Sequence, residues 1–170
     1  HALSTHKADN EIDFFSAVDD LQSEEEAGAG MTSTLEFNSA TYYRFAAVNL
    51  GMLADNGHLG ALEPEQRQTV VRTFVEATVK AIPGARKNTM NANTLPVYVL
   101  GVVREKGHPL QLVNAFENPV RPRQGYAGQS VELLKEEYAK LKDTWGVEAV
   151  LETAIPDVTL STFLDKVVKH

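Results

Sequence analysis

Three carboxylates alternate near the start of the chain, at Asp9, Glu11 and Asp13. This spacing begins a calcium loop of the EF-hand type, but Phe14 stands where that loop needs the glycine of its sharp turn. The same carboxylates could instead hold Mg²⁺ for phosphodiester cleavage. The simpler alternative is a solvated acidic segment. We expect the solvated segment, and we assign no metal, cofactor or catalytic residue.

A second pattern is basic and polar, and it follows the Pro-Gly pair at positions 83–84. Four consecutive residues carry groups that commonly contact phosphate and sugar: Arg86, Lys87, Asn88 and Thr89. The pattern predicts contact with a nucleic-acid backbone, and the alternative is an ordinary polar loop between a helix and a strand. Arg121 and Arg123 form a second cationic patch of lower specificity.

Phe14 and Phe15 are two adjacent aromatics inside an acidic segment that ends in glycines at positions 28 and 30. One interpretation is that they anchor this segment to the protein's own core. The other is that they project, as wedges against stacked bases or as anchors in a partner's pocket. The residues alone leave both interpretations open.

Other catalytic patterns are missing from the sequence. The five histidines have no pair at i, i+4 spacing that would suggest a metalloprotease helix: His1, His6, His58, His108 and His170. The glycines at 28 and 30 follow three glutamates and lack a Walker lysine, which disfavours a phosphate loop. The sequence therefore favours binding or scaffolding over catalysis.

Composition describes an ordinary chain of 170 residues, long enough for a hydrophobic core. With no cysteine, disulfide scaffolds and Cys-ligated metal sites are excluded. The longest apolar run, 97–103, is too short to span a membrane. The net charge of −7 is uneven, because residues 1–37 sum to −8 and residues 83–125 to +4. Such asymmetry indicates an interaction surface.

The hydrophobic patterns predict an α+β chain. The expected elements are a short strand at 3–8, a projecting loop or hairpin at 9–30, a long strand at 35–50, a helix at 64–82 opened by Pro64, a buried strand at 97–103 and an extended piece at 109–116. Two further helices should close the chain. Ser130 is expected to cap the first, Gly146 to end it, and Leu160, Phe163, Leu164 and Val167 to line the last.

Several of these segments resemble, in the same order, the CasC family, the CT1975-like branch of the RAMP superfamily. Its members form the backbone of Cascade, the type I-E CRISPR surveillance complex. The similar segments are residues 2–6 with 11–21, 36–50, 83–87 and 114–117. The resemblance runs from His1 to about Val120 and weakens after it.

The resemblance implies an RRM-like, ferredoxin-like palm with a projecting thumb hairpin. Residues 1–8 would be a palm strand, 9–34 the thumb, and 35–170 the C-terminal part of the palm with its helices. The chain begins deep inside the family sequence, so we expect a fragment whose palm lacks the first strand, the first helix and the finger domain. Its open sheet edge should then pair with another copy, or its strands should exchange places within the sheet.

The implied function is a cytoplasmic, non-catalytic scaffold that binds CRISPR guide RNA. The implied partners are the guide RNA and its target-strand DNA heteroduplex, other copies of the chain and other Cascade subunits, with no membrane. Base pairing would supply specificity while the protein reads shape and backbone. Phe14, Phe15 and Val18 would be thumb wedge or docking residues, and residues 86–89 would lie near the guide RNA.

Two other functions stay open. Some related type III backbone subunits cut RNA with a thumb aspartate, so Asp9, Glu11 or Asp13 could serve a metal-dependent ribonuclease. The chain could also be a protein-interaction module with no direct RNA contact.

Overall fold

The computed structural model describes residues 2–17, 31–82, 91, 93–121 and 124–169. The fold is α+β, as the sequence predicts. Its strands are β1 Ala2–Ser4, β2 Glu11–Ala17, β3 Met31–Phe37, β4 Tyr42–Arg44, β5 Val99–Val103 and β6 Leu151–Ile155. Its helices are α1 Leu50–Leu53, α2 Pro64–Lys80, the 3-10 helix η2 Val113–Phe116, α4 Ala127–Trp145 and α5 Leu160–Val167. The strands form three two-stranded antiparallel sheets, β1–β4, β2–β3 and β5–β6.

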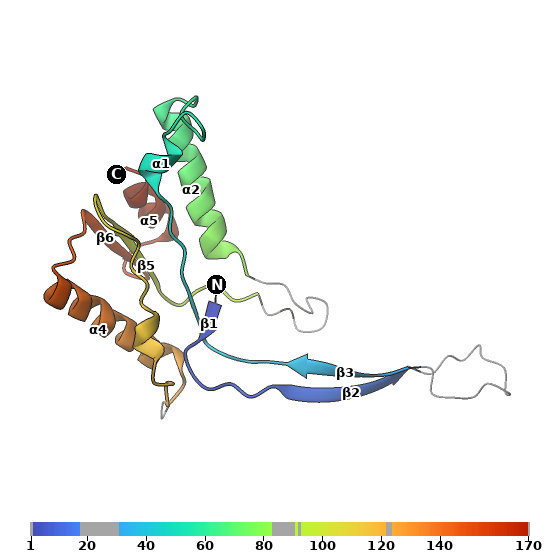
Figure 1. Cartoon of the computed structure of the whole chain (residues 1–170). Coiled ribbons are helices and arrows are strands. Elements are labelled where there is room, and N and C mark those ends of the chain that lie inside the picture. Colours follow the sequence, from blue (N-terminus) through green and yellow to red (C-terminus); the bar gives the residue numbers. More distant parts are fainter. Residues whose placement is uncertain (1, 18–30, 83–90, 92, 122–123, 170) are drawn as a thin grey trace, which may run out of the picture.

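The β2–β3 hairpin projects from the rest of the molecule as a long arm (Figure 1). We call β2 and β3 the arm, and the remaining elements the body. The arm pairs in register from Glu11 opposite Phe37 to Ala17 opposite Met31. The sequence favoured a loop or hairpin over residues 9–30, and the structure has a hairpin whose second strand continues to Phe37.

The single long strand expected at 35–50 is wrong. β3 ends at Phe37, four residues without strand structure follow, and β4 covers only Tyr42–Arg44 in a different sheet. Polar side chains explain the break. The Asn38 side chain donates a hydrogen bond to Asn10 and accepts one from the Tyr42 hydroxyl, and such bonds compete with regular strand pairing. The alternation of residue types continues through this break, so periodicity alone could not locate it.

The long helix predicted from Pro64 is confirmed as α2. Pro64 occupies the first turn, where a missing N–H costs nothing. The backbone N–H of Glu63 donates to Oε1 of Gln66 at 3.0 Å, which satisfies one donor at the helix start. The predicted last helix is confirmed as α5, where the Thr159 hydroxyl accepts from the Thr162 backbone N–H.

The body has two packed regions. In one, Phe163 and Leu164 of α5 are almost fully buried, and α5 packs on β5, β6 and α2. The Phe163 ring lies directly over Gly101 of β5. In the other, η2 packs on α4, and Leu112, Phe116 and Val120 are buried there. Phe116 also meets the Tyr43 ring, with centroids 5.5 Å apart, so this region extends to the β1–β4 sheet.

Three further expectations need correction. The extended piece at 109–116 contains instead the 3-10 turn of η2. Ser130 does not cap α4, which begins at Ala127; its hydroxyl lies inside the helix, next to Thr5 Oγ1 and the Tyr126 carbonyl. β6 was not expected at all. Gly146 does end α4, with φ of 59° in the left-handed region that favours glycine.

Within the described parts of the chain, none of the helices combines the length and the apolar character that crossing a bilayer requires.

Candidate nucleic-acid interface

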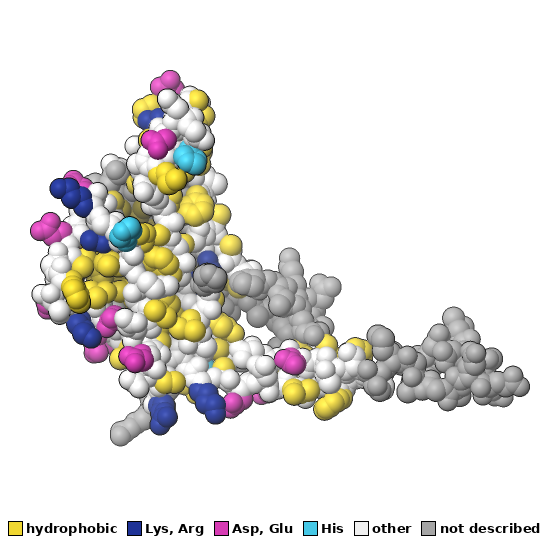
Figure 2. All heavy atoms as spheres, viewed as in Figure 1, with side chains coloured by type: hydrophobic (Ala, Val, Ile, Leu, Met, Phe, Trp, Pro, Cys, Tyr) yellow, Lys and Arg dark blue, Asp and Glu magenta, His cyan; other side chains and the backbone are white. Residues whose placement is uncertain are grey.

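The arm presents its two phenylalanines on opposite faces. Phe14 pairs with Thr34 and shares its face with Ile12, whereas Phe15 pairs with Ser33 on the other face. Phe14 is 78% exposed and Phe15 is 39% exposed. Hydrophobic side chains are therefore visible along the arm as well as on the body (Figure 2). Phe14 is not anchored in the protein's own core, and Val18 lies outside the described residues.

The three carboxylates near the start of the chain lie on or beside this arm. Glu11 and Asp13 are exposed strand residues, and Asp9 pairs loosely with Lys7, with Nζ and Oδ1 3.9 Å apart. The described residues contain no cluster of three or more His, Cys, Asp or Glu that could hold a metal ion. The carboxylates here are solvated side chains of an open hairpin.

The basic segment Arg86, Lys87, Asn88 and Thr89 lies outside the described residues. The end of α2 that leads into it is described. The Arg44 guanidinium of β4 donates to the carbonyl of Ala81 at 2.5 Å and also to that of Thr78. These carbonyls at the helix end lack partners inside the helix. Arg44 therefore ties the end of α2 to the β1–β4 sheet.

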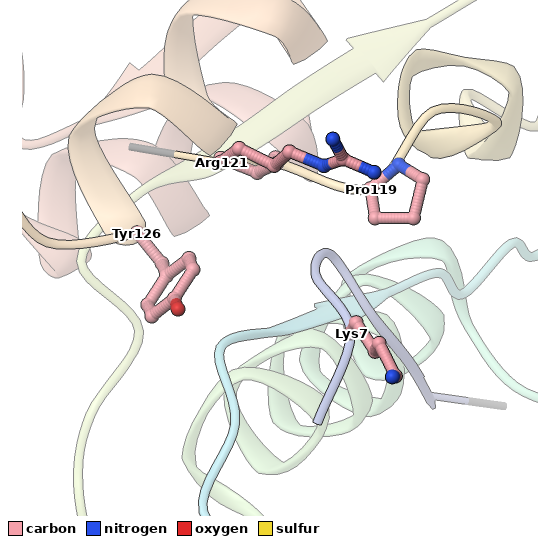
Figure 3. Close-up of a pocket in the computed structure, with 5 residues that line it drawn as sticks. Lys7, Pro119, Arg121 and Tyr126 are labelled. Atoms are coloured by element: carbon pink, nitrogen blue, oxygen red, sulfur yellow. The ribbon is translucent and has the colours of Figure 1, made fainter. Parts of the chain in front are cut away.

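A hollow of about 340 Å³ brings two cations together with an aromatic ring. Its lining consists of Lys7, Pro119, Val120, Arg121 and Tyr126 (Figure 3). Lys7 follows β1, Arg121 follows η2, and Tyr126 immediately precedes α4. The sequence singled out Arg121 but missed Lys7 and Tyr126, and Arg123 lies outside the described residues.

One backbone hydrogen bond and one ring stack hold the walls of this hollow together. The N–H of Val120 donates to the carbonyl of Thr5 at 3.0 Å, which places the segment after η2 beside the segment after β1. The Tyr126 ring stacks on His6, with ring centroids 3.7 Å apart and planes 16° apart. These contacts join residues more than a hundred positions apart in the sequence, so no local pattern could have predicted them.

The chemistry of the hollow suits an anion next to an aromatic or apolar group. The Lys7 side chain is mostly exposed, and Arg121, which also lines the hollow, is exposed too. Arginine and lysine contact phosphates, and aromatic rings stack on unpaired bases. Asp9 is the ion-pair partner of Lys7, but the two charged atoms are 3.9 Å apart and both side chains are exposed. Such surface pairs are weak. The Lys7 ammonium thus stays available to a phosphate.

Comparisons with known proteins point to one family. The family model of CT1975-like proteins matches residues 1–165. A chain of a solved CRISPR RNA-guided surveillance complex is similar with a TM-score of 0.81 and 28% identity, over 99% of this chain and 68% of that chain. A chain of a pre-nicking CRISPR RNA-guided surveillance complex is similar with a TM-score of 0.79 and 28% identity, over 99% of this chain and 48% of that chain. A search of curated proteins finds no match.

Proposed function

The chain belongs to the family of CT1975-like proteins, and from this premise we propose that it is a non-catalytic backbone subunit of a CRISPR RNA-guided surveillance complex. The similarity to a chain of such a complex, which covers 99% of this chain at a TM-score of 0.81, carries the proposal. The chain spans about two thirds of one such relative and about half of another. Because this chain spans only part of these relatives, their role in the complex is proposed for this chain as one part of such a subunit.

In this proposal the β1–β4 and β5–β6 sheets and their helices belong to an RRM-like palm, and the arm is its thumb. The arm is narrow, projecting and open on both faces, as a thumb that reaches a neighbouring copy must be. Phe14 is its contact residue in preference to Phe15, because a ring that is 78% exposed has most of its surface left to bury. Val18 remains a predicted member of the same contact.

The guide RNA backbone is the proposed ligand of the basic groups. Arg86, Lys87, Asn88 and Thr89 remain predicted contacts. The hollow between Lys7 and Arg121 adds a second contact point, since it joins two cations to the Tyr126 ring. The partners are the guide RNA with its target-strand DNA, further copies of this chain and other subunits of the complex.

Fluorescence anisotropy with a labelled single-stranded repeat–spacer RNA, at several salt concentrations, tests the proposal. Each phosphate contact on a single strand contributes about −0.7 to the slope of log affinity against log salt. Reversing both charges, Lys7→Glu with Arg121→Glu, should weaken binding and reduce the slope by about 1.4. Lys135→Glu with Lys140→Glu on α4 makes the same change in charge at two exposed sites that do not line the hollow, and should leave the slope nearly unchanged.

The alternatives predict other results in the same assay. A wild-type chain that gives no rise in RNA anisotropy at any salt concentration, with Arg86→Glu and Lys87→Glu making no difference, indicates a module that docks on proteins alone. Mg²⁺-dependent shortening of the RNA that Asp13→Ala abolishes indicates a ribonuclease. Either result refutes the non-catalytic RNA scaffold.

A further inference from the structure

The direction of the arm is set where it leaves the body. Two stretches connect them, residues 5–10 before β2 and residues 38–41 after β3, and we call these together the arm root. Figure 1 shows both strands of the arm running away from the body beyond this point. Contacts at the arm root are therefore the ones that fix the angle of the arm.

His6 joins the two stretches of the arm root. Its side chain is nearly buried, with 9% of the residue exposed. The backbone N–H of Thr41 donates to Nε2 at 3.1 Å, so Nε2 is the unprotonated nitrogen. Nδ1 then carries the hydrogen and donates to the carbonyl of Lys7 at 2.9 Å. One imidazole thus links the outgoing stretch to the returning one.

The same ring attaches the arm root to the body. It stacks on Tyr126, which immediately precedes α4. Thr5, its buried neighbour, accepts the Val120 N–H through its carbonyl and the Ser130 hydroxyl through Oγ1, at 3.0 and 2.8 Å. The Thr5 N–H also donates to the carbonyl of Thr41 at 2.9 Å, so the Thr5 backbone joins the two stretches as well. His6 differs from Thr5 because it makes these links through its side chain, which a substitution can remove.

A second set of bonds on the surface stiffens the outer part of the arm root. The Tyr42 hydroxyl donates to Asn38 Oδ1 at 2.6 Å, and Asn38 Nδ2 donates to Asn10 Oδ1 at 3.0 Å. Asn10 Nδ2 in turn donates to Glu36 Oε2 at 3.3 Å. Because all four side chains are exposed to water, each bond contributes less than the buried contacts of His6.

We propose that His6 is a positioning residue that fixes the direction of the arm relative to the body. Each strand of the arm has seven residues, which at about 3.3 Å per residue is about 23 Å of strand. A rotation of about 10° at the arm root therefore moves the far end by about 4 Å, which is as large as a van der Waals contact distance. That the arm reaches a neighbouring copy rests on the proposed function. That His6 fixes the direction of the arm does not.

The natural lack of cysteine allows the angle to be measured with two engineered labels. Spin labels at Ser16→Cys on β2, near the far end of the arm, and at Glu136→Cys on α4 report the distance from arm to body by electron paramagnetic resonance. Labels at Glu136→Cys and Ser161→Cys report a distance within the body. All three positions are exposed. The measurement uses the full chain without RNA, so it succeeds or fails independently of the proposed function.

His6→Phe keeps a ring that can stack on Tyr126 but offers no acceptor to the Thr41 N–H. We expect the arm-to-body distance distribution to shift or broaden by several ångströms while the distance within the body stays the same. A purely structural role would alter both distances or neither, and an unchanged arm-to-body distribution overturns the proposal. Should His6→Phe fail to fold, His6→Leu decides, because it fills the site with a flexible apolar side chain and offers neither the acceptor nor the ring. Broadening again supports the proposal, and the wild-type distribution refutes it.

Discussion

Gly101 in the middle of β5 should be intolerant of even one added methyl group. A Cβ at this position would lie 2.6 Å from Cζ and 2.8 Å from Cε2 of Phe163, where ordinary contact begins near 3.4 Å. Phe163 is only 2% exposed, so its ring has no free volume into which it can move. Overpacking of this kind costs about 1–3 kcal/mol. Because both contacts lie far below 3.4 Å, the upper part of this range applies, about 2–3 kcal/mol. Replacing a strand glycine recovers about 0.5–1 kcal/mol of backbone entropy, which leaves a net loss of about 1–2.5 kcal/mol.

Thermal unfolding of Gly101→Ala, followed by circular dichroism, measures this loss. For a chain of this size 1 kcal/mol corresponds to about 2–4 °C, so the Tm should fall by about 2–10 °C. Gly128→Ala makes the same chemical change in α4, where nothing lies within 4 Å of the added Cβ, and should leave the Tm equal or higher. A Gly101→Ala chain as stable as the wild type would show that α5 does not press on β5 at this point.

Three further predictions follow from buried and exposed groups. Burial, with Glu152 nearby, raises the pKa of Tyr138 from 10.0 to about 12. As the pH rises, the unfolded chain therefore loses this proton before the folded chain does. The free energy of unfolding should then fall between about pH 10 and pH 12. Urea titrations of Tyr138→Phe should show a shallower fall, and an identical slope would contradict the assignment. Thr5→Val removes the buried Oγ1 that bonds to the Ser130 hydroxyl and leaves that hydroxyl only the Tyr126 carbonyl. It should cost about 1 kcal/mol in urea unfolding, whereas wild-type stability would count against that bond. Phe14→Ala should change the free energy of unfolding by less than about 0.5 kcal/mol. It should nevertheless weaken the assembly of several copies on RNA, as measured by sedimentation. A marked loss of stability would mean that the ring packs within the chain.

Local signals in the sequence predicted the elements whose determinants are themselves local. Pro64 and the apolar spacing after it predicted α2, and Gly146 predicted the end of α4. β6 escaped prediction because it is short, carries Glu152 at its second position and owes its strand conformation to antiparallel pairing with β5. The break after Phe37 escaped for a similar reason, since side chains from a distant part of the chain create it.

The candidate interface was only half visible in the sequence. Adjacent aromatics and adjacent cations can be read directly, but only the structure shows that Phe14 is exposed. Lys7 and Tyr126 gave no signal, because each has an ordinary neighbourhood in the sequence. Their proximity comes from the bond between Val120 and Thr5 and from the stack on His6, which are contacts between distant segments. Prediction of such a site needs the tertiary fold.

The opposite placement of Phe14 and Phe15 makes the arm sensitive to the parity of insertions and deletions. Side chains alternate with a period of two, so one residue inserted between Asn10 and Phe14 would turn the more exposed ring to the other face. Two inserted residues would restore the original face and lengthen the reach by about 7 Å. In related chains, this strand should therefore tolerate insertions or deletions of an even number of residues. An odd number should be accompanied by an exchange of residue types between adjacent positions, which returns the exposed ring to its original face.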